Sequence, residues 1–179
     1  MRLNERTAVV TSLALLLAVA GATAGQEAQS GGGGGGGESS ANMQVSANVI
    51  RKCTIRADPM NFGSYDPVQA NATAPLDGQA TITVACTKGT SVDLGMDTGQ
   101  NAQGNNRRMS GGGSNYLAYE IYKDQSHTDV WRDSGNGELD GGVAPSRDPR
   151  QFVAYGRIAG GQDVPEGNFQ DTVLVTVDF

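Results

Sequence analysis

Apolar and polar residues alternate along the last nine positions of the chain, 171–179. The apolar positions on one side of this stretch are Val173, Val175, Val177 and Phe179. A period of two predicts a β-strand with one buried face. Because the sequence ends at Phe179, we expect this strand to lack a neighbour on one side. Open apolar strand edges pair readily with other strands.

A second alternating stretch lies near the beginning of the chain, at residues 42–50. Its apolar positions are Met43, Val45, Ala47 and Val49. The strand predicted here has no obvious neighbour in the sequence. One unfinished sheet edge and one spare strand in the same chain predict assembly by strand exchange between molecules.

The rest of the chain reads as short strands separated by residues typical of turns. We expect these strands at 53–57, 79–87, 92–96, 115–123, 130–132 and 151–158. The second and third are predicted to form a hairpin through residues 88–90, and the segments 97–114 and 133–150 are predicted to be polar loops.

These elements predict an all-β fold, because no apolar period of 3.6 residues follows residue 24. An immunoglobulin-like β-sandwich has about seven strands, and from residue 53 onward we count about six main ones. The missing strand would follow Phe179. The sequence therefore predicts an incomplete immunoglobulin-like sandwich that lacks its final strand and is completed by a donor strand.

The chain divides into four predicted parts. Residues 1–24 resemble a secretory signal peptide, because a basic start and an apolar run at 8–20 precede Ala22-Thr-Ala24. This run is too short for a transmembrane anchor. Residues 25–41 form a glycine-rich flexible linker, 42–50 the donor strand, and 51–179 the sandwich domain.

The charge of the chain argues against a nucleic-acid partner. The formal net charge is −6 for the full sequence, and removal of residues 1–24 takes away two arginines and one glutamate, which leaves −7. No segment clusters Lys and Arg with aromatic residues. Binding to phosphate backbones requires a positive face, so we expect no nucleic-acid binding.

Two cysteines, Cys53 and Cys86, are present in the whole sequence. An even, isolated pair in an exported protein favours a disulfide, which would stabilise the fold by roughly 3–4 kcal/mol. Metal binding is the alternative, but it would need further ligands, and His127 is the only histidine. We therefore predict a disulfide and no metal site.

No pattern in the sequence predicts catalysis or a cofactor. Asp97-Thr-Gly99 matches the tripeptide of aspartic proteases, but that chemistry needs two carboxylates, and a turn after the preceding strand explains the residues better. His127 lies in a polar stretch and is predicted to be solvated. Trp131 and the tyrosines could form a sugar-binding platform, but core packing is the simpler interpretation.

Several short motifs, taken in order, resemble the spore coat protein U domain family, which includes pilin subunits of the archaic chaperone–usher pathway. The motifs are Cys53-Thr-Ile, Phe62-Gly-Ser-Tyr, Ala85-Cys-Thr, Arg108-Met, Leu117-Ala-Tyr-Glu-Ile-Tyr-Lys-Asp, Tyr155-Gly-Arg-Ile and the run from Pro165 to Phe179. The resemblance covers residues 43–179, and the C-terminal run is its most specific part.

The resemblance implies a structural subunit, not an enzyme, and partners of a particular kind. A periplasmic chaperone would lend a strand during export through an outer-membrane usher, and the N-terminal strand of an identical or related subunit would replace it in a fibre. The implied location is the cell surface, as a fimbria or a spore or cell coat, with a role in adhesion or biofilm formation. The alternative is a secreted binding module, for example for carbohydrate, whose own N-terminal strand folds back into the groove.

Overall fold

The structure is a computed structural model, and it describes residues 37–179. The predicted signal peptide and most of the glycine tract lie outside the described residues. The described residues fall into two units, 37–45 and 46–179. In the first unit, the described residues 37–45 form no helix or strand.

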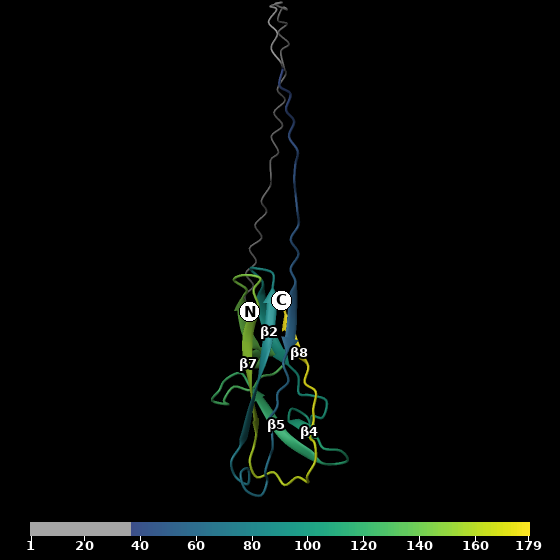
Figure 1. The fold of residues 1–179 in the computed structure, drawn as a ribbon, viewed down its shortest axis with the longest axis vertical. Helices are drawn as coiled ribbons and strands as arrows, with labels where there is room; N and C mark the ends of the chain where they lie inside the picture. Colours follow the sequence, from purple (N-terminus) through teal and green to yellow (C-terminus); the bar gives the residue numbers. More distant parts are fainter. Residues whose placement is uncertain (1–36) are drawn as a thin grey trace, which may run out of the picture. The chain divides into compact units, whose positions relative to one another are not determined.

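The second unit contains eight described strands and one short 3-10 helix (Figure 1). The strands are β1 (Cys53–Ala57), β2 (Leu76–Cys86), β3 (Ser91–Met96), β4 (Arg107–Ser110), β5 (Tyr116–Tyr122), β6 (Leu139–Val143), β7 (Arg150–Ile158) and β8 (Val175–Asp178). The helix η1 (Gly135–Gly137) precedes β6. Within the described residues the fold is therefore all-β, as the sequence predicts.

The strands form two antiparallel sheets that pack face to face. The first has the order β1-β2-β7-β5-β4, and the second has the order β6-β3-β8. Between them lies an apolar core, because alternate residues of each strand point inward. The fully buried core residues include Ile82, Val84, Val92, Leu94, Trp131 and Ile158.

The predicted hairpin between residues 79–87 and 92–96 is wrong. Residues 76–86 and 91–96 do form β2 and β3, but these strands belong to different sheets. The turn at 87–90 carries the chain across the core, so that the apolar sides of the two strands face each other. Two strands with strongly apolar faces bury more surface in this arrangement than they would as neighbours in one sheet.

Two strands occupy segments that the sequence predicted to be loops. β4 is polar in sequence, but its first residue, Arg107, is fully buried, and its guanidinium donates hydrogen bonds to two backbone carbonyl groups. β6 contains Gly141 and Gly142, and because glycine is uncommon in strands, the sequence did not predict one here. A Cβ atom at Gly141 would lie 2.7 Å from side-chain atoms of Leu94 and Val92, so only glycine permits this close approach to β3.

The predicted short strand at 130–132 is also wrong, since only an isolated bridge joins Val130 to Tyr122. The last predicted strand is shorter than expected. Regular pairing begins at Val175, and the preceding residues 171–174 are held by irregular hydrogen bonds to the segment that follows β3. A cavity lies beside residues 169–175 and is the candidate site.

Candidate functional site

The first sheet ends in an open edge at β1. Among the described strands, β1 pairs only with β2. Lys52 O accepts a hydrogen bond from Thr87 N, and Asp58 N donates one to Thr81 O. Backbone groups in an antiparallel pair point alternately toward and away from the partner. The N–H and C=O groups of Cys53, Ile55 and Ala57 therefore point to the open side.

The second sheet ends in a matching open edge at β8, which pairs only with β3 among the described strands. Asp97 N donates to Leu174 O, and Leu174 N donates to the Oδ1 atom of Asp97. By the same alternation, the backbone groups of Val173, Val175 and Val177 point away from β3. Two unpaired strand edges of the sandwich thus border one opening.

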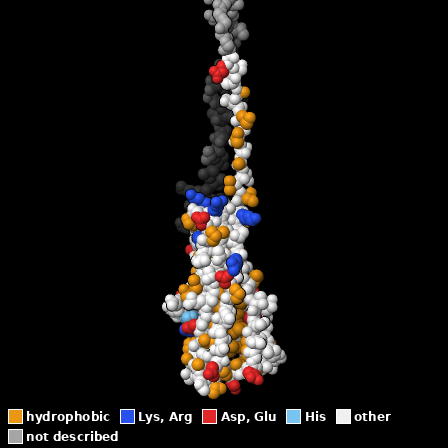
Figure 2. All heavy atoms as spheres, viewed as in Figure 1, with side chains coloured by type: hydrophobic (Ala, Val, Ile, Leu, Met, Phe, Trp, Pro, Cys, Tyr) orange, Lys and Arg blue, Asp and Glu red, His pale blue; other side chains and the backbone are white. Residues whose placement is uncertain are grey.

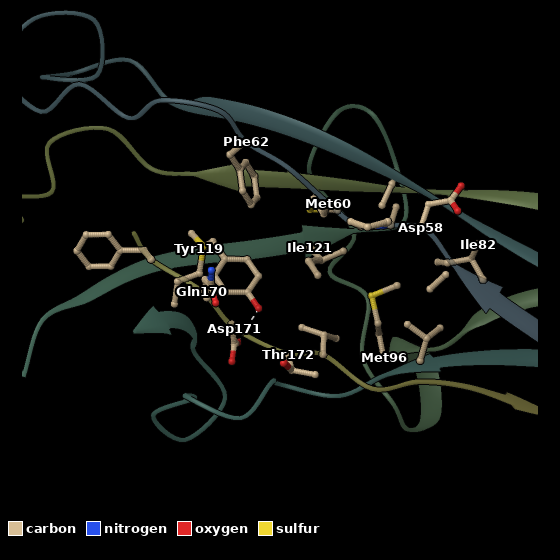
Figure 3. Close-up of a pocket in the computed structure, with 18 residues that line it drawn as sticks. Asp58, Met60, Phe62, Ile82, Met96, Tyr119, Ile121, Gln170, Asp171 and Thr172 are labelled. Atoms are coloured by element: carbon tan, nitrogen blue, oxygen red, sulfur yellow. Dashed lines mark hydrogen bonds between the residues drawn. The ribbon is translucent and has the colours of Figure 1, made fainter. Parts of the chain in front are cut away.

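A cavity of about 460 Å³ occupies this opening between residues 57–62 and 169–175 (Figure 3). We call it the groove. Its lining is mostly apolar, with contributions from Ala57, Pro59, Met60, Phe62, Ala80, Ile82, Met96, Met109, Tyr119, Ile121, Ala154, Phe169, Val173 and Val175. The groove therefore borders the core, although Ile82, Met96 and Ile121 stay buried beneath it. Ile55, on the open edge of β1, is 36% exposed.

A second cavity of about 700 Å³ continues the groove at one end of the sandwich. It is bordered by residues 60–67 and 164–170, and it is more polar than the groove. The two cavities share the lining residues Met60, Phe62, Met109, Phe169 and Gln170. The opening is therefore continuous from the edge of β8 to this end of the molecule.

One polar pair lies in the otherwise apolar groove. The hydroxyl of Tyr119 donates to Oδ2 of Asp171 at 2.7 Å (Figure 3). Oδ1 of Asp171 accepts from the backbone N and Nδ2 of Asn101. Burial raises the pKa of Tyr119, and the hydrogen bond to Asp171 raises it further, so the phenol remains a donor. Within residues 37–179, no salt bridge joins Asp171 to a cation.

A buried arginine on β4 links the first sheet to the second sheet. Arg107 donates to the carbonyl oxygens of Met96 and Trp131 at 2.9 and 2.8 Å, and to Oε1 of Glu120 at 2.5 Å. Arg132 also binds Glu120. Burial alone would raise the pKa of Glu120, but hydrogen bonds from Arg132, from a backbone N–H and from Arg107 outweigh it and lower the pKa. The ion pair therefore persists at neutral pH.

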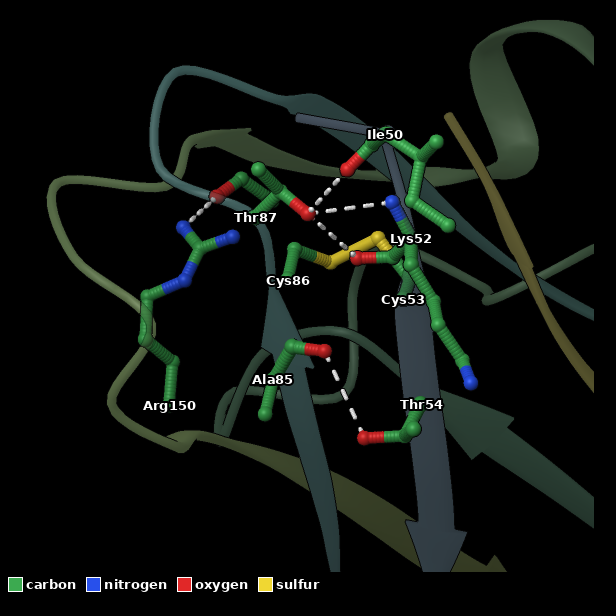
Figure 4. Close-up of a disulfide and its surroundings, with 9 residues drawn as sticks. Ile50, Lys52, Cys53, Thr54, Ala85, Cys86, Thr87 and Arg150 are labelled. Carbon is green, nitrogen blue, oxygen red and sulfur yellow. Dashed lines mark hydrogen bonds between the residues drawn. A yellow bond between two sulfur atoms is a disulfide. The ribbon is translucent and has the colours of Figure 1, made fainter. Parts of the chain in front are cut away.

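The disulfide between Cys53 and Cys86 lies at the other end of β1 (Figure 4). The two cysteines stand directly opposite each other in the β1–β2 register. Beside them, the Thr87 hydroxyl accepts from Lys52 N and donates to Ile50 O, both at 3.1 Å. The disulfide predicted from the sequence is confirmed, and it anchors the segment that leads into β1.

The predicted acceptor residues lie along the open edge of β8. Val173 and Val175 line the groove, and Val177 is half-buried against the core. Phe179 follows the strand and is 50% exposed. The sequence did not reveal the opposite wall at residues 57–62, although Phe62-Gly-Ser-Tyr was recognised as a motif. It also gave no sign that Tyr119 and Asp171 would meet.

The predicted donor residues are exposed. Met43, Val45 and Val49 are 86%, 85% and 81% exposed, and Ala47 is exposed as well. Residues 42–50 pair with no strand among the described residues, so the strand predicted there does not form in the single chain. Residues 42–50 therefore keep an apolar face that no described strand covers.

The prediction of a solvated His127 is wrong. Its side chain is only 7% exposed. The imidazole packs edge to face against the rings of Tyr122 and Tyr155, and its backbone has a positive φ of 56°. Residues 37–179 contain no cluster of His, Cys, Asp and Glu that could hold a metal ion. No helix in the described part of the chain is long and apolar enough to cross a membrane.

Comparison with known families identifies the architecture. The model of the spore coat protein U domain matches residues 39–176. The chain belongs to this family. It is 32% identical over 180 residues to Protein U of Myxococcus xanthus, covering 93% of this chain and 99% of that protein. The family is structural, and the chain is a structural subunit and not an enzyme.

A solved structure extends the comparison to pili. The chain resembles one chain of the pre-assembly complex between the chaperone CsuC and the tip adhesion subunit CsuE of the archaic chaperone–usher Csu pili of Acinetobacter baumannii. The TM-score is 0.55 with 27% identity, and the match covers 73% of this chain. The chain spans 40% of the length of that solved chain.

Proposed function

We propose that the chain is a secreted subunit of a chaperone–usher surface fibre or coat that joins its neighbours by donating residues 42–50 into their grooves. The observation that carries this proposal is the groove itself, bordered by the unpaired edges of β1 and β8. A strand inserted there can form backbone hydrogen bonds on both sides, and its alternate side chains can fill the apolar cavity.

The dimensions and composition of residues 42–50 support this role. Nine residues in extended conformation span about 30 Å, which suits a site bordered by the ten residues 53–62. Strand alternation places Met43, Val45, Ala47 and Val49 on one face. Burying a Met or Val side chain contributes about 1.5–3 kcal/mol, so the inserted strand would be held firmly.

The likeness to a chaperone–subunit complex supports a chaperone that covers the groove before assembly. An outer-membrane usher would then exchange the chaperone for the next subunit. The predicted signal peptide fits export through the periplasm, and the assembled product would lie on the cell surface, where adhesion and biofilm formation take place.

The alternative is a monomeric binding module whose own residues 42–50 close the groove. In the described residues, Val49 and Ile50 are exposed and neither pairs with β8. This observation favours donation to another molecule over self-closure.

The proposal is tested by comparing Val45→Asp with Ser46→Asp. Val45→Asp would bury an unpaired carboxylate in the neighbour's groove, which is costly, so polymer should disappear. Ser46→Asp would place the same charge on the outward face and should be tolerated. Boiling-resistant polymers on gels and surface fibres in electron micrographs provide the measurement. Normal polymer from Val45→Asp would exclude residues 42–50 as the donor.

A further inference from the structure

The two ends of the sandwich carry opposite charge (Figure 2). We define the basic pole as residues 50–52, 87–90 and 144–150. Backbone hydrogen bonds bring these segments together, from Thr87 N to Lys52 O, from Gly89 N to Ala144 O and from Ala144 N to Thr90 O. The basic pole contains Arg51, Lys52, Lys88, Arg147 and Arg150 against one acidic residue, Asp148.

We define the acidic pole as residues 60–75 and 159–170, at the far end of β2 and β7. The Tyr65 hydroxyl donates to Ala159 O and accepts from Gln162 N, and Gly161 N donates to Asn71 O. These two segments contain three acidic residues, Asp66, Asp163 and Glu166, and no lysine or arginine. They also border the second cavity, where the groove opens at this end.

Each pole lies beside one of the two parts of the proposed assembly contact. The donor segment leaves the domain at the basic pole, and the groove opens at the acidic pole. Ile50 and Lys52 are held by Thr87, so the donor segment leaves the molecule at the basic pole. A donor strand that entered a groove from that same pole would meet the acceptor's own N-terminal segment. Entry from the acidic pole avoids this conflict and gives a head-to-tail contact between unlike surfaces, which is the geometry of an open filament.

We infer that the acidic pole of one subunit meets the basic pole of a second copy of this chain, and that the attraction between these two charged surfaces speeds assembly. This inference rests on the proposed function and adds the two surfaces that meet and the charges that attract them. Arg51, Lys52, Lys88 and Arg147 are exposed at one pole, and Asp163 and Glu166 are exposed at the other. In a chain of formal charge −6, a strongly basic end is the surface that suits the acidic mouth of the groove.

A row of three aspartates and a single aspartate in the groove also alter the electrostatic fields of the two poles. Asp93 lies opposite both Asp140 and Asp178 on the outer face of the second sheet, and this row weakens the field of the basic pole from the side. Asp171, inside the groove without a salt-bridge partner in the described residues, strengthens the field of the acidic pole. The complementary field would act mainly on the rate of encounter.

Charge reversal at each pole tests the inference. Asp163→Lys with Glu166→Lys reverses the acidic pole, and Lys88→Glu with Arg147→Glu reverses much of the basic pole. In about 0.02 M NaCl, each reversal should slow polymer growth of the purified protein at least about tenfold, and the four changes combined should restore it. In about 0.5 M NaCl the differences should largely vanish, because salt screens exposed charges.

The matched control is Asp133→Lys with Gln125→Lys and Ser134→Lys. It changes the net charge as much as the acidic-pole reversal does, but at exposed positions in the loop between β5 and β6, away from both poles. It should leave growth within about twofold of wild type. Neutral substitutions, Asp163→Asn with Glu166→Gln, should give an intermediate rate. Circular dichroism and thermal unfolding verify that every variant is folded.

The outcomes separate this inference from the proposed function. Wild-type growth rates in the acidic-pole reversal, or no recovery in the combined variant, would overturn the inference while leaving donor exchange intact. A wild-type protein that remains monomeric in both salt concentrations would contradict the proposed function and this inference together.

Discussion

The hydroxyl of Tyr119 donates to the carboxylate of Asp171 at 2.7 Å and thereby joins the two sheets across the groove. Tyr119 belongs to β5 in the first sheet, and Asp171 precedes β8 in the second. The two edges that border the groove belong to different sheets and do not pair with each other. The link between Tyr119 and Asp171 therefore helps to hold the two sheets at a fixed distance beside the groove.

Tyr119→Phe should lower the free energy of unfolding by about 1–3 kcal/mol, because the partly buried carboxylate of Asp171 loses a donor. Urea unfolding followed by circular dichroism measures the effect. Tyr155→Phe is the control, since within residues 37–179 the Tyr155 hydroxyl has no hydrogen bond, whereas its ring contact with His127 would be retained. Equal losses in the two variants would show that the hydroxyl of Tyr119 is unimportant.

Ala80→Phe should block assembly without unfolding the protein. Ala80 lines the groove from β2, and a phenyl ring there would occupy space that the donor strand needs. Gln79→Phe places the same ring on the exposed outer face of the same strand. We expect polymer to fall at least about tenfold for the first variant, if the added ring disrupts packing of the donor by about 1–3 kcal/mol, and to be unchanged for the second. Gel analysis of polymer together with thermal unfolding provides the comparison, and abundant polymer from Ala80→Phe would contradict the placement of the donor.

Loss of the disulfide should lower stability by about 3–4 kcal/mol, as the entropy of the closed loop predicts. Replacing Cys53 and Cys86 together by alanine avoids free thiols, and denaturant unfolding measures the change. Mass spectrometry of the wild-type protein without reduction supplies the second observation, since two free thiols would show that the bond is absent from the isolated protein.

Glu120→Gln should destabilise the protein at neutral pH by about 3–5 kcal/mol, because it leaves the guanidinium of Arg107 buried without its counter-charge. The pKa of Glu120 is lowered in the folded state from its ordinary value of 4.5. A lowered carboxyl pKa stabilises the fold above the unfolded value, and this contribution is lost as the pH falls through the folded value. The difference between wild type and variant should therefore shrink in acid.

Urea unfolding at several values between about pH 3 and pH 7 gives the two stability curves. Other carboxylates with lowered pKa values, including those of Asp77 and Asp124, remain in both proteins, so only the difference between the curves reports on Glu120. A difference that stays constant across this range would exclude Glu120 as the titrating group.

Strands with a clear period of two could be predicted from the sequence. Ile82, Val84 and Cys86 on β2 and Val92, Leu94 and Met96 on β3 are buried as their alternation indicated. Each strand has one apolar face that must leave water, and the local sequence is enough to identify it. The same reasoning identified the apolar residues of the last strand.

The parts that could not be predicted depend on contacts between distant residues. β4 looked like a loop because Arg107 is polar, and its burial depends on Glu120 and on carbonyl groups from other strands. β6 looked like a loop because glycines are needed where it approaches Leu94. The wall of the groove at residues 57–62 carries no alternation, so only the fold shows that it faces β8.

The disulfide also determines how a fibre of the proposed kind would respond to pulling. Tension from a neighbouring subunit would arrive through residues 42–50 and enter the domain at Cys53. Without a covalent bond, that load would act first on the few hydrogen bonds between β1 and β2. The Cys53–Cys86 bond passes it directly into β2, which is paired on both sides by β1 and β7. The weakest mechanical element of the fibre would then be the inserted strand and not the subunit, and a stretched fibre would fail between subunits before any domain unravelled.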